Sequence, residues 1–206
     1  MVLEKETTTE QTTKRVKKAS SSQKETTTKK KSLVNCDIEN YTVEGNVTTS
    51  ERNSLAKSLN KLPSNIIDKF NDEGWELCLT TKDIAKNYYV GSVKGSIAGV
   101  TVYNEKIIYV SVDVSYPSTK YTAYHEMGHF LDWCNNYSSS TDEFEQIYNS
   151  EKSSLAISGR SNRQKNHARS DTTEYYAESF SAYMFGCLKD ECPDTYEYIT
   201  NDLQNI

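Results

Sequence analysis

The stretch TAYHEMGHFLDW, residues 122–133, constrains the fold and chemistry of this chain more than any other. It holds two of the three histidines, His125 and His129, four positions apart, and Glu126 directly follows the first. Residues four apart lie on one face of an α-helix, so both imidazoles can point at a single ion. Glu126 follows about 100° further round, beside any water held by that ion. The pattern favours a metal-binding catalytic helix over an ordinary helix whose histidines bind no metal.

The residues around this stretch fit the same interpretation. Ser118 or Thr119 can cap the helix, which is expected to run to about Cys134. Apolar side chains at 127, 130 and 131 would bury the face opposite the histidines, and Gly128 removes a side chain on the crowded side. Zinc held by two imidazoles lowers the pKa of a bound water towards ~7, and a nearby carboxylate can then take its proton. The expected chemistry is therefore metal-assisted hydrolysis with Glu126 as the general base.

A third protein ligand is still needed, because catalytic zinc usually has three ligands and a water. The extended motif HExxHxxGxxH is excluded, since Asp132 and Asn135 stand where it requires Gly and His. The stretch DTTEYYAESFSAYM, residues 171–184, offers Glu174 and Glu178 on one helical face. We predict that Glu174 binds the metal and that Glu178 orients a ligand histidine from behind. The alternative is a capping box from residues 171 to 174, in which Glu174 only bonds back to the helix start.

The third histidine, His167, stands seven residues before Glu174 in a stretch expected to be a polar loop. A lone loop histidine is commonly just solvated. A hydrolase of this kind also needs a donor facing the oxyanion that develops in the transition state, and a loop leading into the ligand helix could supply it. Both interpretations of His167 remain open, and His167 is a candidate catalytic residue together with Glu126.

The remaining pattern predicts an α+β domain with a short mixed sheet and a helical C-terminal half. Two β-branched runs, Val100–Tyr103 and Ile107–Val114, are expected to form a hairpin across residues 104–106, packed on the HEMGH helix, with Pro117 ending the sheet. The spacing of apolar residues and the turn signals place the other elements. These are two helices within 50–71, a strand at 75–81, and helices at about 142–155, 171–188 and 193–203.

Charge and composition divide the chain unevenly. Residues 1–32 hold nine Lys or Arg, four Asp or Glu and twelve Ser or Thr, with a net charge of +5. The segment holds too few apolar residues to offset the entropy that its backbone would lose on ordering. It is therefore expected to be a disordered Thr/Lys/Ser-rich tether. The remaining residues, 33–206, carry a net charge of -10, which argues against nucleic-acid binding, and should form one domain with regular structure from about Ser50.

The five cysteines form no CxxC pair and are odd in number, so neither a disulfide scaffold nor a thiolate zinc site is expected. Cys187 and Cys192 flank a predicted helix end and could pair, although free buried thiols are equally consistent with their spacing. The sequence holds no run long enough to span a membrane and shows no export signal at its start.

The two motifs together resemble a known family. HEMGHFLD, the spacing of 45 residues from His129 to Glu174, and EYYAESF are similar to the catalytic domain of anthrax lethal factor and to clostridial Pro-Pro endopeptidases. The resemblance runs from about Ser50 to the C-terminus and includes FEQIYNSEKSSL and CPDTYEYITNDL. These are secreted zinc metalloproteases of the gluzincin type. The resemblance therefore implies a small gluzincin-type domain with His125, His129 and Glu174 as zinc ligands and Glu126 as base.

The same resemblance assigns the remaining site residues. Glu178 takes the supporting position behind the ligands, and His167 stands where lethal factor has a tyrosine that assists the transition state. A histidine can also stabilise an oxyanion, so this departure changes the chemistry of the position without removing its role. In such proteases the substrate lies extended along an edge strand, which makes residues 98–103, and Gly99, Val100 and Thr101 in particular, the expected substrate strand. A plain hairpin that only covers the helix is the alternative.

The sequence thus predicts a zinc-dependent endopeptidase that acts on protein or peptide substrates as a monomer, secreted or tethered to the cell surface. A protease-like adaptor with an idle site is the alternative from a different class. Zinc-dependent hydrolysis of a non-peptide bond is a third possibility.

Overall fold

The sheet beneath the HEMGH helix is mixed and short. In the computed structural model, the described residues form four strands in the order β1 (Tyr41–Glu44), β2 (Glu76–Thr80), β4 (Ile107–Ser111) and β3 (Gly99–Val102). β1, β2 and β4 are parallel neighbours, whereas β3 pairs antiparallel with β4 through the predicted hairpin. This leaves β3 as one edge of the sheet, with Thr101 opposite Ile108. The predicted α+β class and mixed sheet are confirmed.

The structure describes residues 33–89, 95–114, 118–157 and 162–206. The tether predicted at 1–32 and the strand end predicted at Pro117 lie outside these residues. Residues 31–206 group into one unit by their contacts, and this unit is the one described below. Among the described residues, no helix is long and apolar enough to cross a membrane.

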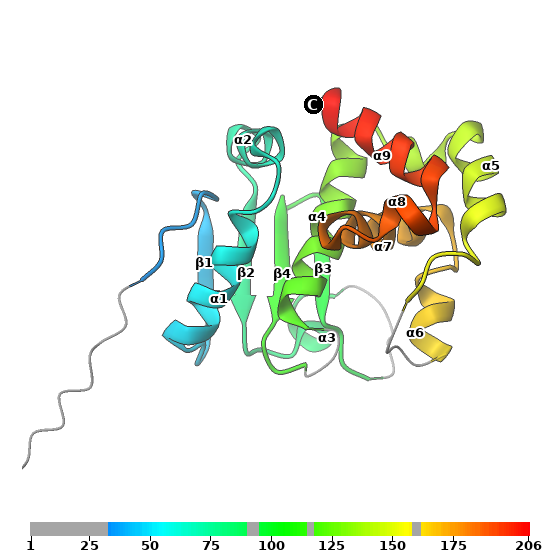
Figure 1. Cartoon of the computed structure of the whole chain (residues 1–206). Helices are drawn as coiled ribbons and strands as arrows, with labels where there is room; N and C mark the ends of the chain where they lie inside the picture. The colour runs from blue at the N-terminus through cyan, green and yellow to red at the C-terminus, as the bar shows by residue number, and fades with distance from the viewer. Residues whose placement is uncertain (1–32, 90–94, 115–117, 158–161) are drawn as a thin grey trace, which may run out of the picture. The chain divides into compact units, whose positions relative to one another are not determined.

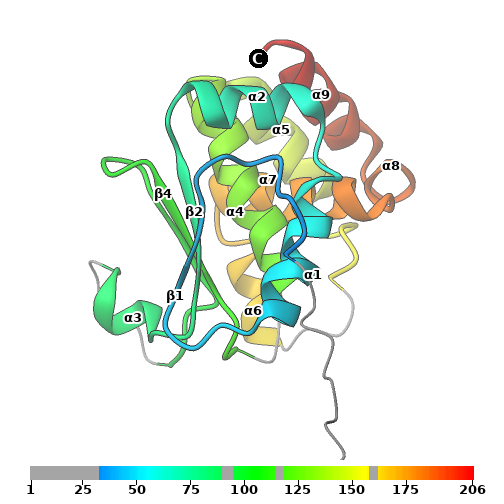
Figure 2. The same cartoon turned by 90° about the vertical axis from the view of Figure 1, so that its left-hand side faces the viewer.

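Helices surround the sheet on both faces. They are α1 (Thr49–Leu59), α2 (Ser64–Asp72), α3 (Ile84–Asn87), α4 (Thr119–Cys134), α5 (Asp142–Glu151), α6 (Asn162–His167), α7 (Thr172–Phe185), α8 (Leu188–Glu191) and α9 (Pro193–Gln204), with a 3₁₀ turn at Ser138–Ser140. α4, the HEMGH helix, lies along the sheet face next to α1, with α7 against its other side (Figure 1). The view turned by 90° shows α3 on the opposite face of the sheet (Figure 2). The site-bearing helices therefore form a layer beside the edge strand β3.

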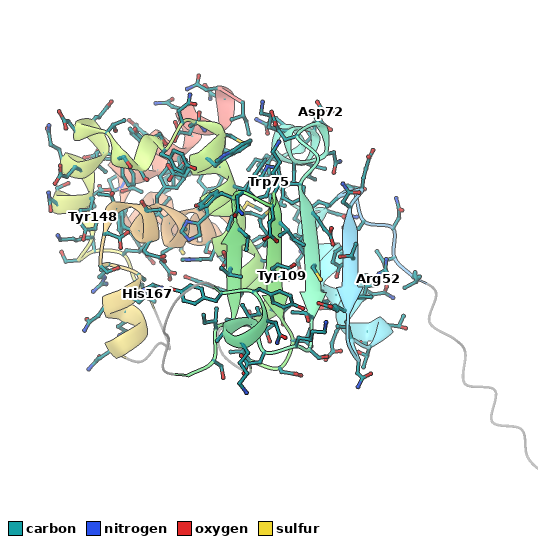
Figure 3. All side chains as sticks on the ribbon, turned by 180° about the vertical axis from the view of Figure 1, so that it is seen from behind. Arg52, Asp72, Trp75, Tyr109, Tyr148 and His167 are labelled. Carbon is teal, nitrogen blue, oxygen red and sulfur yellow. The ribbon has the colours of Figure 1, made fainter. Side chains whose placement is uncertain are left out.

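The side chains of β4 alternate between the two faces of the sheet and pack against different helices. Successive strand side chains point to opposite faces. Ile108 and Val110 are fully buried within the core shared with α4. Tyr109 faces the other way and stacks on Tyr88, which ends α3, with ring centroids 3.8 Å apart (Figure 3). The strand thus packs against α4 on one side and α3 on the other.

An aromatic cluster holds one end of α4 to the sheet. Trp75, which is fully buried and directly precedes β2, packs edge-on against Phe130 and Trp133 at centroid distances of 5.2 and 5.3 Å. Phe70 from α2 meets Phe130 edge-on at 5.0 Å. Burying side chains of this size contributes several kcal/mol in total, at about 25 cal/mol per Å² of apolar surface. The cluster therefore fixes α4, and with it both histidines, relative to the sheet.

The structure corrects several boundaries. Regular structure does not start at Ser50, because β1 lies before it and Ile38 and Tyr41 are already buried. Four residues with one buried side chain are too short a pattern to reveal β1 in the sequence. The short helices α3, α6 and α8 were also not predicted, and the helix expected at 171–188 ends at Phe185 because Gly186 adopts a left-handed conformation. All five cysteines are free, so Cys187 and Cys192 form no disulfide.

Gly128 allows α4 and α7 to approach each other closely, as its position in the motif suggested. A Cβ placed on it would lie 2.7 Å from Ala177 Cα and 3.0 Å from Phe180 Cβ. Because the nearest atom belongs to backbone, the contact cannot relax by a rotamer change. Gly128→Ala is therefore expected to destabilise the fold by about 1–3 kcal/mol, although Ala is intrinsically the better helix former by about 1 kcal/mol. Thermal unfolding measures this effect, and a raised melting temperature would show that the helices are not this close.

Candidate metal centre

Two helices bring three metal-binding side chains together. His125 and His129 come from α4 and Glu174 from the first turn of α7. One ligand atom from each lies within 4.8 Å of the others, so the three could hold one metal ion. His125 Nε2 is 3.3 Å from Glu174 Oε2, and His129 Nε2 is 3.8 Å from Glu174 Oε1. The two motifs that stand 45 residues apart in the sequence thus meet at one point.

Local capping explains how each helix presents its ligands. The Ser118 side chain accepts a hydrogen bond from the Tyr121 N–H and begins α4 seven residues before His125. Asp171 caps α7 by accepting from the Glu174 N–H at 2.9 Å. The two interpretations of Glu174 are thus compatible: its backbone takes part in the cap, while its carboxylate faces the histidines.

The donor set fits a zinc ion. Glu174 Oε2 is buried and makes no well-formed hydrogen bond among the described residues, although the imidazole nitrogens of His125 and His167 lie 3.3 and 3.4 Å from it. Two imidazole nitrogens and one carboxylate oxygen are the ligands of many catalytic zinc sites, which keep a fourth position open for water or substrate. A cation at this point would satisfy the buried oxygen.

Glu178 and Tyr121 lie behind His125. Glu178, only 1% exposed, has its Oε2 3.4 Å from His125 Nδ1, the ring nitrogen that faces away from Glu174. The Tyr121 hydroxyl donates to Glu178 Oε1. A carboxylate behind a ligand histidine fixes its ring orientation and tautomer. Sequence reasoning found Glu178 but missed Tyr121, which stands four residues before His125 and could have been found by the same helical spacing.

The histidines and carboxylates of this site shift one another's pKa values. Burial disfavours the charged imidazole of His125, but the carboxylates of Glu174 and Glu178 overcome this and raise its pKa to about 10. Burial also opposes ionisation of Glu174, yet the neighbouring imidazole of His125 and its charge lower the pKa of Glu174 to about 2. For His129, burial and the neighbouring charge of His125 lower the pKa to about 4. A metal ion must displace the proton on His125, because imidazole binds metal only when deprotonated.

Glu126 is buried beside the same site. It is 5% exposed, and burial raises the pKa of its carboxyl to about 7, against the opposing effect of His125 and a hydrogen bond from Thr101. Thr101 Oγ1 donates to Glu126 Oε2 at 2.8 Å. A carboxylate with a pKa near neutrality suits a group that takes up and releases a proton.

His167 also lies beside Glu174. It is the last residue of α6 and does not lie in a loop, which corrects the prediction for this position (Figure 3). Its Nε2 is 3.4 Å from Glu174 Oε2, and its side chain is 68% exposed. The His167 carbonyl accepts from the Ser170 N–H at 2.9 Å, which links α6 directly to the start of α7. An exposed imidazole next to the ligand carboxylate is open to a bound substrate.

The predicted substrate strand is β3, the edge strand nearest to α4. Its side chains alternate, and Gly99 and Thr101 face Glu126. The edge position leaves one side of the strand outside the ladder with β4. The inner face of β3 therefore lies against Glu126, a contact that the sequence did not predict.

Comparison with known proteins adds a second line of evidence. Residues 20–202 match the family described as anthrax toxin lethal factor, N- and C-terminal domain. The chain belongs to the anthrax toxin lethal factor family. This confirms the resemblance inferred from the HEMGH and EYYAESF stretches.

Two known proteins are similar to this chain. A Pro-Pro endopeptidase from Paenibacillus alvei is 27% identical over 182 residues, which are 78% of this chain and 81% of that protein. The solved structure of the Pro-Pro endopeptidase PPEP-2 from the same organism has a TM-score of 0.62 at 24% identity, and the match covers 80% of this chain and 98% of that one. The structural likeness supports the α+β fold described above.

Proposed function

We propose that this protein is a zinc-dependent endopeptidase. The observation that carries the proposal is the cluster of His125, His129 and Glu174 ligand atoms within 4.8 Å of one another, with Glu126 buried beside it. Membership of the lethal factor family and similarity to a protein named as an endopeptidase support the same activity. No other arrangement of the described residues gives three metal-binding side chains in one place.

In the proposed site, His125, His129 and Glu174 hold the ion. Bound zinc would supply an acidified water and polarise a substrate carbonyl. Glu178 keeps the His125 ring in place, and Tyr121 keeps Glu178 in place. These groups lie on α4 and α7, so the close packing of the two helices at Gly128 sets the geometry of the ligands.

Glu126 acts as the general base in this proposal. Its buried carboxylate takes a proton from the water that adds to the peptide carbonyl carbon, and then gives this proton to the leaving amine as the C–N bond breaks. A base of this kind works best when its pKa is close to the operating pH, and burial brings Glu126 towards that value. The Thr101 hydroxyl limits where the carboxylate can point.

His167 is proposed to donate to the developing oxyanion. Its Nε2 reaches the ligand carboxylate from the exposed side of the site. A donor there would stabilise negative charge that exists only in the transition state, so it raises the rate without tightening substrate binding. His167 thereby takes the position of the family tyrosine.

The substrate is proposed to be a peptide that lies along the edge strand β3, beside Gly99, Val100 and Thr101. Backbone hydrogen bonds to an edge strand hold an extended peptide with little regard to its side chains. The charge of -10 on residues 33–206 argues against a nucleic-acid substrate. We further propose that the protein is a monomer and that residues 1–32, rich in Thr, Lys and Ser, tether it outside the cell or at its surface.

A peptide-library digest read by mass spectrometry tests the function. The full chain is incubated with the library after removal of metal and again after addition of one equivalent of zinc. Because the relative is named a Pro-Pro endopeptidase, the library includes peptides with adjacent prolines. Cleavage that appears only with zinc supports the proposal. Zinc binding without any cleaved peptide would indicate a protease-like adaptor or hydrolysis of a bond other than the peptide bond.

Replacing His167 separates its oxyanion role from a structural one. His167→Ala is expected to lower kcat by about 10²-fold, as loss of an oxyanion donor does elsewhere, while zinc affinity stays unchanged. His167→Tyr should recover much of the rate, because tyrosine occupies this position in lethal factor. The measurements are kcat on a library-derived peptide and zinc affinity by competition with a chelator. An unchanged rate in His167→Ala would leave His167 as a solvated side chain.

A further inference from the structure

The inner face of β3 makes direct contact with Glu126 at two positions. Thr101 Oγ1 lies 2.8 Å from Glu126 Oε2, a normal distance for a hydroxyl hydrogen bond to a carboxylate. Two residues earlier on the same face, a Cβ added to Gly99 would lie 2.6 Å from Glu126 Oε1 and 2.9 Å from its Cγ. Thr101 thus donates a hydrogen bond to the Glu126 carboxylate, and the missing side chain of Gly99 leaves room for that carboxylate.

The Thr101 hydroxyl is well fixed by its surroundings. Threonine is branched at Cβ, which restricts its side-chain rotation, and pairing with Ile108 holds its backbone in the sheet. The hydroxyl has one proton to donate. The Glu126 carbonyl oxygen is 3.4 Å from Oγ1, so the carboxylate at 2.8 Å is the closer acceptor. A fixed donor bonded to a carboxylate oxygen restricts the rotation of that carboxylate.

We propose that Thr101 is a positioning residue for the general base, and that Gly99 keeps the space into which the base fits. This inference rests on the proposed function, since it assigns Glu126 as the base. The hydroxyl holds Oε2, and Oε1 lies over Gly99, where any larger residue would displace it.

β3 would then position both the substrate and the general base, whose separation determines the rate. The outer edge of β3 is proposed to hold the peptide backbone, while its inner face holds Glu126. A misplacement of about 1 Å between reacting groups can cost about 100-fold in rate. The bond from Thr101 links the carboxylate, which α4 carries, to the strand that is proposed to hold the substrate.

Isosteric substitution tests the role of the hydroxyl. Thr101→Val removes the donor and keeps the shape, and it should lower kcat on a library-derived peptide by about 10- to 100-fold, with KM and zinc affinity unchanged. Thr101→Ser keeps the donor and should stay within a few-fold of the unsubstituted chain. Thr42→Val is the matched control, because Thr42 lies on β1 and its hydroxyl donates to the carboxylate of Glu76 at 2.5 Å. This control should leave kcat unchanged.

A second measurement does not depend on activity. In the metal-free full chain, Thr101→Val should lower the melting temperature by about 3 °C or more, because it removes a hydrogen bond to a buried carboxylate. In a Glu126→Leu background the hydroxyl has lost this acceptor, so the same substitution should leave the melting temperature unchanged or raise it. The difference between the two backgrounds reports the contact itself.

The outcomes separate this inference from the proposed function. If the unsubstituted chain cleaves no peptide, the proposed function fails, and the melting temperatures still decide whether Thr101 holds Glu126. If the chain is active, a Thr101→Val rate equal to that of the unsubstituted chain would overturn the positioning role. A Thr101→Ser rate as low as that of Thr101→Val would do the same, as would loss of zinc from Thr101→Val. Equal melting shifts in both backgrounds would also overturn it.

Discussion

Glu126→Gln is expected to reduce peptide cleavage by about 10³-fold or more while zinc still binds with unchanged affinity. The amide has nearly the same size as the carboxylate, but it cannot accept the proton that a general base must take. Because Glu126 is not one of the three clustered ligands, the ion has no need of its charge. Initial rates on a library-derived peptide and zinc affinity by chelator competition measure the two effects separately.

The matched control for this variant is Glu145→Gln, which makes the same change on the exposed surface of α5. It should cleave as fast as the unsubstituted chain. Equal rates for Glu126→Gln and Glu145→Gln would show that Glu126 is not the base. Loss of zinc from Glu126→Gln would instead make Glu126 part of the ligand set.

Glu174→Gln is expected to abolish zinc-dependent cleavage by removing the metal. The neutral amide is a much weaker ligand than the carboxylate, and zinc affinity should fall by more than about 100-fold, because loss of a partner behind a ligand already costs about 10- to 100-fold. Oε2 of this carboxylate is buried and makes no well-formed hydrogen bond, so the variant removes a negative charge that a bound cation would balance. Titration with zinc and cleavage assays at rising zinc concentration measure the loss.

Glu197→Gln, on the exposed surface of α9, is the control for charge alone and should bind zinc normally. Partial recovery of Glu174→Gln activity at high zinc would support a ligand role for the side chain. Unchanged affinity in Glu174→Gln would remove Glu174 from the site. The fold of this variant should survive, because Asp171 caps α7 through the Glu174 backbone N–H, which the substitution keeps.

The sequence predicted the parts of the site that follow helical spacing. His125 and His129 are one turn apart, as are Glu174 and Glu178, so each pair must share a face wherever its helix is placed. Gly128 was correctly assigned to a crowded contact, and the structure identifies the contact as Ala177. The convergence of the two helices on one point depends on tertiary packing, and it was predicted because catalytic zinc needs a third ligand, with the family resemblance implying the same set.

The sequence could not reveal features set by contacts between distant segments. β1 has a single buried residue, so its alternation was too weak to stand out, and it forms because β2 offers a parallel partner. α6 is a short polar helix that would be unstable by itself. The bond from Thr101 to Glu126 depends on the register of β3 over α4, which no local pattern encodes.

X-ray absorption at the zinc edge of the zinc-loaded full chain tests the central claim, that three side chains bind one catalytic zinc ion. We expect one zinc per chain, surrounded by two imidazoles and further oxygen ligands at about 2.0–2.2 Å. The alternative is that zinc binds to one or more of the five free cysteines. A sulfur ligand at about 2.3 Å, or a spectrum that keeps both imidazoles in His125→Ala and His129→Ala, would contradict the account.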